Sequence, residues 1–252
     1  MKRLYLNEEK YISYEKITNN DSDNRYLVFL HGLMSDMHGK KSCHIQNFCN
    51  FHRLNFLSFD NLGHGASWGN FTEQNISIWF DSFQKIYKRL LLGKKLIIIG
   101  SSMGGWISIL FALRYPKEVQ SLLLLAPAPD FTEHIWYKLN NEQRISLKEE
   151  GIIRVKGEDE CHQGFDISYN LIQDGRKNLI LDQAIIDIDL PVAIIHGLKD
   201  KEVDYQQSMQ ILQKISSNKI FLHYSKNSTH HLSEIEDLNM ISSSLLMLLK
   251  LS

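Results

Sequence analysis

The sequence predicts an α/β fold, with a mainly parallel central sheet flanked by helices. The first observation is a set of short apolar runs, each bounded by small or polar residues, at 26–31, 55–60, 95–100, 121–126 and 192–197. Runs that are apolar at nearly every position are typical of strands covered on both faces, as in a parallel sheet. The second observation is that longer spans with helical periodicity separate these runs, which favours repeated strand–helix–strand units.

The remaining elements follow in order along the chain. Residues 2–6 and 11–17 are expected to pair as an antiparallel edge at the start of the sheet. The other expected elements are helices over 76–92, 104–115 and 205–216, and a sixth apolar run at 219–224. Because ligands of such sheets bind outside the carboxyl ends of the strands, functional residues are sought directly after each run.

One interval departs from this alternation. About 60 residues lie between Pro127 and Leu190, and a structureless loop of that length is uncommon in a compact domain. Residues 130–150 look helical, 151–165 are compatible with a hairpin, and 166–173 are compatible with a second helix. We therefore expect one domain over 1–252 with a short cap inserted at 130–185. An ordinary pair of crossover helices is the alternative.

Composition excludes several classes of protein. The 252 residues carry 28 Lys+Arg against 29 Asp+Glu, a net charge of -1, so the basic excess of nucleic-acid binding is missing. No run reaches the ~18 apolar residues of a membrane helix. The cysteines Cys43, Cys49 and Cys161 are too few and too scattered for a disulfide framework or a zinc site. Acidic residues near the start replace the apolar run of a secretory signal, so we expect a soluble, cytoplasmic protein.

The segment from Gly100 to Gly104 reads G-x-S-x-G, with Ser102 at its centre. It follows an apolar run and precedes a helical span, which is the strand–turn–helix setting of a nucleophile elbow. A serine in such a strained turn needs neighbours two residues away that have almost no side chain. Ser102 meets that requirement, whereas Ser101 is offset by one position. The sequence therefore predicts Ser102 as a nucleophile at a helix N-terminus.

A serine hydroxyl needs a base, and in this architecture the chain order is Ser, acid, His. Asp200 lies just after the run 192–197 and is the favoured acid, with Glu202 and Asp204 as competitors. After the run 219–224 come His230 and His231. Adjacent residues point in different directions, so one of the two serves as the base. We favour His230, oriented by Asp200.

Two further turns follow apolar runs. The turn after 26–31 begins His31-Gly32-Leu33, and the backbone N–H of Leu33 is expected to form an oxyanion hole with that of Met103. The turn at 60–67 has two spaced glycines, but neither a dinucleotide fingerprint nor a P-loop is present. We interpret 60–67 as a structurally demanding loop.

Together these motifs resemble the α/β-hydrolase family over nearly the whole chain. A narrower resemblance, at 32–42, 100–106 and 196–200, is to the mitochondrial branch of acyl-glucuronide esterases and palmitoyl-protein thioesterases and its bacterial relatives. That resemblance implies a serine hydrolase for acyl esters and thioesters. It places the triad roles on Ser102, Asp200 and His230, with Leu33 and Met103 as oxyanion donors. Thr229 and the second histidine depart from the family's pattern. We see no mitochondrial targeting segment before the domain and therefore do not expect the organelle to carry over.

The leading hypothesis is therefore a serine esterase or thioesterase that works through an acyl-enzyme and needs no metal or cofactor. Met34, Phe131 and Trp136 are expected to contact a small-molecule or protein-bound acyl substrate, although cap aromatic residues also serve packing. One alternative is an esterase for the methyl ester of a carrier-protein-bound acyl chain, of the pimeloyl type in biotin synthesis. Its acidic partner would need a basic rim, for which the candidates are Lys40, Lys41, Arg154 and Lys156. The other alternative is a non-catalytic binding protein on the same fold.

Overall fold

The computed structural model describes residues 1–155 and 164–251, so Cys161 and Lys156 lie outside the described residues. An eight-stranded sheet runs through the molecule in the order β1-β2-β4-β3-β5-β6-β9-β10. Its strands are β1 (Lys2–Tyr5), β2 (Tyr11–Ile17), β3 (Arg25–Leu30), β4 (Asn55–Phe59), β5 (Lys95–Ser101), β6 (Val119–Leu125), β9 (Val192–Gly197) and β10 (Ile220–Ser225). The pairs β1–β2 and β2–β4 are antiparallel, and the others are parallel. The predicted α/β class is confirmed.

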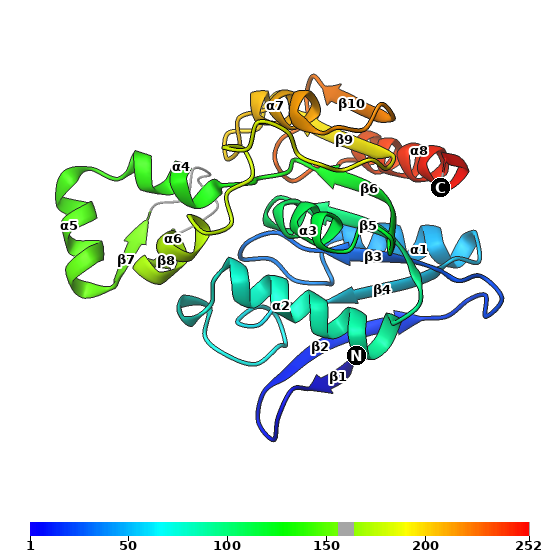
Figure 1. Cartoon of the computed structure of the whole chain (residues 1–252), viewed down its shortest axis with the longest axis horizontal. Helices are drawn as coiled ribbons and strands as arrows, with labels where there is room; N and C mark the ends of the chain where they lie inside the picture. The colour runs from blue at the N-terminus through cyan, green and yellow to red at the C-terminus, as the bar shows by residue number, and fades with distance from the viewer. Residues whose placement is uncertain (156–163, 252) are drawn as a thin grey trace.

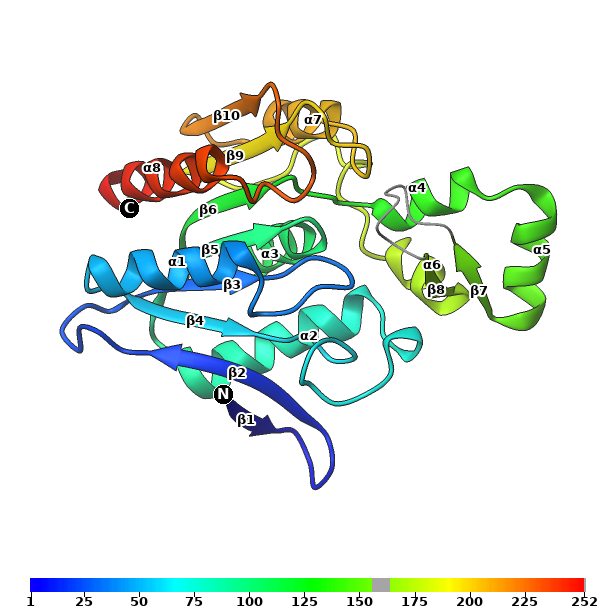
Figure 2. The same ribbon diagram turned by 180° about the vertical axis from the view of Figure 1, so that it is seen from behind.

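Helices cover both faces of this sheet (Figures 1 and 2). One face carries α2 (Ile76–Ile86), with its continuation through a π-helical turn at Tyr87–Leu91, together with α3 (Met103–Arg114) and α7 (Gln206–Lys214). The other face carries α1 (Lys40–Phe51) and α8 (Ile235–Leu251). A short 3-10 turn (Phe71–Glu73) precedes α2.

Strand β3 shows why the apolar runs are continuous. Val28 and Leu30 pack into the core on the α2 and α3 face, while Leu27 and Phe29 pack into the core on the α1 and α8 face. Successive side chains of a strand point to opposite faces, so a strand covered twice needs an apolar residue at every position. Each of these four side chains is at most 3% exposed.

The segment between β6 and β9 projects beyond the carboxyl edge of the sheet (Figure 1). It contains α4 (Phe131–Lys138), α5 (Asn141–Glu150), the hairpin strands β7 (Ile152–Val155) and β8 (Phe165–Ser168), and α6 (Tyr169–Gly175). A small apolar cluster of its own is formed by Leu139, Leu147, Ile167 and Ile172.

Two boundaries in this segment differ from the sequence prediction. The single helical stretch expected over 130–150 is divided, because Asn140 forms a capping box with Gln143 and starts a new helix there. The helix expected over 166–173 begins only at Tyr169. Ser168 accepts a hydrogen bond from the N–H of Leu171 at 3.1 Å and so fixes the start of α6.

Two buried carboxylates hold this segment in place: one joins its two ends, and the other bonds it to α2. Asp130, at its entry, accepts hydrogen bonds from the N–H groups of Ile180 (2.9 Å) and Leu181 (2.8 Å), at its exit. Asp174 accepts from the N–H and the hydroxyl of Ser77, both at 2.8 Å, in the first turn of α2. Both ends of the segment and its last helix are therefore fixed by hydrogen bonds.

None of the helices within the described residues is long and apolar enough to cross a membrane.

Candidate active site

Ser102 occupies a strained turn between β5 and α3, with φ 53° and ψ −118°. This is a conformation that residues with a side chain seldom adopt. A Cβ at Gly100 would lie 2.4 Å from the carbonyl oxygen of Gly104, and a Cβ at Gly104 would lie 2.3 Å from that of Leu30. Both positions therefore require glycine, which is the steric reason for the G-x-S-x-G pattern.

His230 lies in the loop after β10, and its Nδ1–H donates to Oδ2 of Asp200 at 2.7 Å. The ring is oriented so that Nε2 is the nitrogen left for chemistry. His231 lies apart from this hydrogen bond. Its ring centroid is 6.5 Å from that of His230, and its carbonyl oxygen accepts a hydrogen bond from Lys41. The geometry favours His230 over His231 as the base.

Asp200 is a fully buried carboxylate. Its Oδ2 also accepts from Nε2–H of His196 at 2.9 Å, and its Oδ1 accepts from the N–H groups of Glu202 and Val203, each at 2.9 Å. Burial raises the pKa of this carboxyl, but the hydrogen bonds from His196 and His230 outweigh burial and hold the pKa well below its usual range. Asp200 is therefore ionised at neutral pH.

Glu202 and Asp204, the two competing acids, do not contact Nδ1 of His230. One carboxylate oxygen of Glu202 lies 3.7 Å from Nε2 of His230, on the opposite side of the ring from Asp200. Glu202 lines the cavity, so it faces the reacting nitrogen rather than Nδ1. Asp204 accepts from the N–H of Gln206 at 2.9 Å, at the start of α7.

The turn after β3 lies beside Ser102. A Cβ added to Gly32 would be 3.1 Å from the Cβ of Ser102, so this glycine lets the two turns meet. The carbonyl oxygen of Gly32 accepts from Nδ1–H of His31 at 2.8 Å, and Nε2 of His31 accepts from the N–H of Asn61 at 3.0 Å. His31 thus holds the turn that carries Leu33. Met103 is the first residue of α3, where backbone N–H groups have no partner within the helix.

The loop at 60–67 supports that turn from behind. The carboxylate of Asp60 accepts from the N–H groups of Met37 (2.7 Å) and Ala66 (2.8 Å), which joins the loop to the segment after Leu33. A Cβ at Gly65 would lie 2.3 Å from this carboxylate. Gly65 therefore leaves room for the buried carboxylate of Asp60 and its hydrogen bonds.

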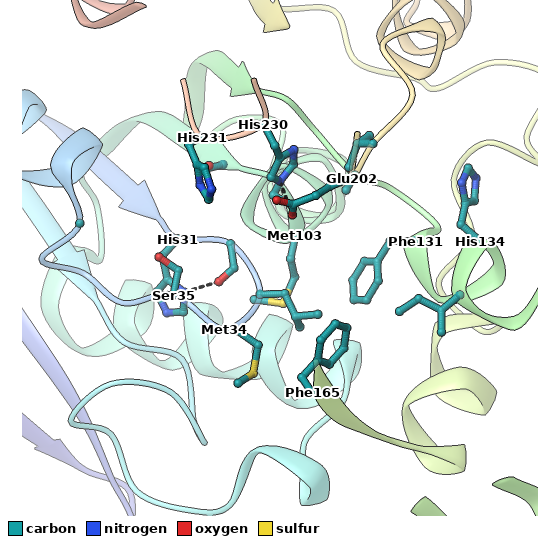
Figure 3. A pocket seen from close by; sticks show the side chains of 18 of the residues that line it. His31, Met34, Ser35, Met103, Phe131, His134, Phe165, Glu202, His230 and His231 are labelled. Carbon is teal, nitrogen blue, oxygen red and sulfur yellow. Dashed lines mark hydrogen bonds and ion pairs between the residues drawn. The ribbon is translucent and has the colours of Figure 1, made fainter. Parts of the chain in front are cut away.

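Ser102, Leu33, Met103 and His230 line one cavity of about 810 Å³. Figure 3 shows Met34, Met103, Phe131 and Phe165 turned toward this space, with His230 and Glu202 beside it. Ile135 and Leu139 line it as well, one and two turns after Phe131 on or just beyond α4. The site is therefore largely apolar on the side of α4 and β8.

Trp136 is not among the residues that line this cavity. It follows Ile135 and so points away from the face of α4 that Phe131 and Ile135 share. Its ring packs near Tyr169, with centroids 6.1 Å apart. The cations of Arg144 (5.4 Å), Lys148 (5.4 Å) and Arg176 (4.9 Å) lie over it. The structure does not bring Trp136 to the site, in contrast to the sequence expectation.

Two polar residues of the cavity wall, Gln207 and His134, carry no recognisable sequence signal. Gln207, on α7, is 4% exposed and donates from its amide to Nε2 of His134, on α4, at 2.9 Å. Lys40 and Lys41, which the sequence offered as candidates for a basic rim, also line the cavity, at the start of α1. Burial lowers the pKa of Lys41 to about 8 despite the nearby carboxylates of Glu202, Asp237 and Asp200.

No group of His, Cys, Asp and Glu suited to a metal ion occurs among the described residues. Cys43 is exposed and Cys49 is buried, and both are free thiols.

A family described as serine aminopeptidase, S33, matches residues 21–152. The chain belongs to this family. It is an α/β-hydrolase of the serine hydrolase class, as the motifs around Ser102 suggested.

The chain is also similar to individual α/β-hydrolases. The mitochondrial palmitoyl-protein thioesterase ABHD10 of Rattus norvegicus is 29% identical over 217 residues, which cover 85% of this chain and 72% of the relative. The solved structure of alpha/beta hydrolase domain-containing protein 10 from mouse superposes with a TM-score of 0.90 at 26% identity, covering 100% of this chain and 99% of that one. A putative hydrolase from Agrobacterium vitis S4 has a TM-score of 0.90 at 26% identity, with 98% and 96% covered. The fold and family predictions are confirmed, and the cytoplasmic location stays a prediction beside relatives named mitochondrial.

Acid should destabilise this α/β-hydrolase partly through His64. Burial, together with the neighbouring His31, lowers the pKa of His64 to about 3. Its ring is 5% exposed and packs on Phe71 and Trp79. In the unfolded chain the imidazole of His64 binds a proton below about pH 6.5, whereas in the folded chain it stays neutral at that pH. The contribution of His64 to stability is therefore complete above about pH 6.5 and is lost as the pH falls.

We expect the free energy of unfolding of the His64→Phe variant, measured by urea denaturation, to fall less steeply than that of the wild type as the pH is lowered. As the pH is lowered from 7 to 4.5, the variant should lose about 2 kcal/mol less of its free energy of unfolding than the wild type loses. Parallel curves for the two proteins would contradict the assignment.

Proposed function

We propose that this α/β-hydrolase cleaves carboxylic esters or thioesters through an acyl-enzyme on Ser102. The observation that carries the proposal is the hydrogen bond of 2.7 Å from His230 to the buried carboxylate of Asp200, in a ring that lines the same cavity as Ser102. An ionised acid at Nδ1 fixes the tautomer in which Nε2 accepts a proton. Relatives that are named palmitoyl-protein thioesterases support an acyl substrate.

In the proposed mechanism, Nε2 of His230 takes the proton of Ser102 as Oγ attacks the acyl carbonyl carbon. The N–H groups of Leu33 and Met103 stabilise the negative oxygen of the tetrahedral intermediate. The bond to the leaving group then breaks, and the imidazolium returns its proton to the departing alcohol or thiol. Water repeats these steps on the acyl-enzyme and releases the carboxylic acid.

We further propose that residues 130–185, of which 156–163 lie outside the described part, act as a cap. Phe131, Ile135 and Leu139 come from this segment and line the cavity, as does Phe165. These side chains form an apolar wall suited to the acyl chain, with Met34 on the opposite loop. The carboxylate of Asp130 joins the two ends of the segment, and that of Asp174 bonds it to α2, so the wall is held in place.

Lys40 and Lys41 in the cavity lining are the observation that favours a second candidate, the methyl ester of an acyl chain on an acidic carrier protein. Arg154, the third described cation of the expected rim, is already paired with Asp166 at 3.2 Å. The observation is therefore weaker than the one that supports a general esterase or thioesterase.

The Ser102→Ala variant should lose turnover of p-nitrophenyl esters and covalent labelling by a fluorophosphonate, because the attacking oxygen is removed. The neighbouring Ser101→Ala variant is the matched control and should still be labelled. Intact-protein mass spectrometry and a p-nitrophenol release assay report the two properties. Labelling that survives in Ser102→Ala would refute the nucleophile assignment.

The Phe131→Ala variant should discriminate against long acyl chains. Removing a ring from the apolar wall should raise KM for p-nitrophenyl octanoate about tenfold and change KM for the acetate little, since a short acyl group does not reach the wall. Tyr137→Ala, at a position on the same helix that is 72% exposed, is the control. An equal effect of Phe131→Ala on both esters would argue against the acyl site.

A further inference from the structure

Asp200 is contacted by a second imidazole besides that of His230. His196 lies near the carboxyl end of β9, and its side chain is fully buried. Its Nε2 is 2.9 Å from Oδ2 of Asp200, the same oxygen that His230 contacts at 2.7 Å. Its Nδ1 is 2.7 Å from the hydroxyl of Ser208 on α7. One carboxylate oxygen is thus shared by two histidine rings.

The protons of this array can be assigned from what each partner is able to do. The ionised carboxylate of Asp200 only accepts, so Nε2 of His196 carries a proton. That proton also faces the carbonyl oxygen of Val203 at 3.2 Å, which again only accepts. A neutral ring then accepts at Nδ1, and the hydroxyl of Ser208 donates to it. Every polar atom of the His196 ring therefore has a partner.

The other contacts of Asp200 do not replace this one. The N–H groups of Glu202 and Val203 both bind Oδ1. Oδ2 receives the hydrogen bond of His230, which itself lies on a loop. Among the described residues, His196 is the one donor to Oδ2 that lies on a strand. The donor from β9 is in place before any reaction step, so the carboxylate does not have to reorient when the imidazolium forms.

We propose that His196 is a positioning residue that fixes Oδ2 of Asp200 toward His230; this inference rests on the proposed function. His196 is not among the residues that line the cavity. It acts through the acid, and Ser208 acts through His196 by fixing the tautomer. Loss of the Nε2 donor should therefore lower kcat and leave KM nearly unchanged.

The test compares His196→Asn with His196→Gln. The amide nitrogen of glutamine reaches approximately where Nε2 lies and can donate to Asp200, whereas that of asparagine reaches only as far as Nδ1. We expect His196→Asn to lose roughly tenfold to hundredfold in kcat, the range for a hydrogen bond to a charged group. His196→Gln should recover most of that loss, and both variants should label with a fluorophosphonate at rates that parallel kcat.

A matched control removes a similar contact elsewhere. His44, on α1, is hydrogen-bonded to the hydroxyl of Ser242 on α8 at 2.8 Å. The His44→Asn variant breaks this histidine–serine pair at two residues that do not line the cavity, and it should keep kcat. A thermal melt of each variant separates loss of stability from loss of activity.

A measurement on the unsubstituted protein decides the question if His196→Asn does not fold. With ¹⁵N-labelled histidine, the proton on Nε2 of His196 and that on Nδ1 of His230 should both give far-downfield resonances. Both should shift when the enzyme is inactivated by a fluorophosphonate, because the two rings share one oxygen.

The inference is overturned if His196→Asn keeps wild-type kcat, if His196→Gln is as slow as His196→Asn, or if the His196 resonance does not respond to inactivation. The Ser102→Ala variant separates this outcome from failure of the proposed function. If Ser102→Ala is inactive while His196→Asn is fully active, only the role of His196 is wrong.

Discussion

The first turn of α3 lies directly against the end of β3, and the rest of the site depends on this contact. Gly104 has no room for a side chain beside the carbonyl oxygens of Leu30 and His31. The approach brings Ser102 next to Gly32, and so brings the nucleophile next to the turn that carries Leu33. Two backbone hydrogen bonds offset the strain in the backbone of Ser102. Its N–H donates to the carbonyl oxygen of Leu125 at 2.9 Å, and its carbonyl oxygen accepts from the N–H of Ala128 at 3.1 Å.

Buried carboxylates fix the loops around this contact. Asp60 joins the Leu33 turn to the loop behind it, and Asp130 joins the two ends of the segment between β6 and β9. Asp237, 1% exposed, accepts hydrogen bonds from Ser228 and from the N–H of Glu234, and so fixes the loop that carries His230. A buried charge is tolerated only where hydrogen bonds replace water. Each carboxylate therefore specifies one arrangement of the backbone that surrounds it.

The sequence predicted the structure well where local steric limits or burial determine which residue type can occupy a position. The apolar run of β5 and the glycines around Ser102 specify a buried strand and its turn without reference to any distant residue. The choice between His230 and His231 was favoured but open, because it depends on where the loop after β10 meets the loop after β9. Trp136 was misplaced because the break between α4 and α5 and the packing of α4 decide which face meets the cavity. The role of His196 was not predicted, because it depends on a carboxylate brought back toward it by the turn at 197–200.

The central claim is that the reaction proceeds through an acyl group bound to Ser102. The most direct measurement is rapid acid quenching of the enzyme during turnover of a p-nitrophenyl ester, followed by peptide mass mapping. We expect the mass of the acyl group on the peptide that contains Ser102, appearing with a burst of p-nitrophenol. Sustained turnover with no acyl adduct, or an adduct confined to another residue, would contradict the mechanism.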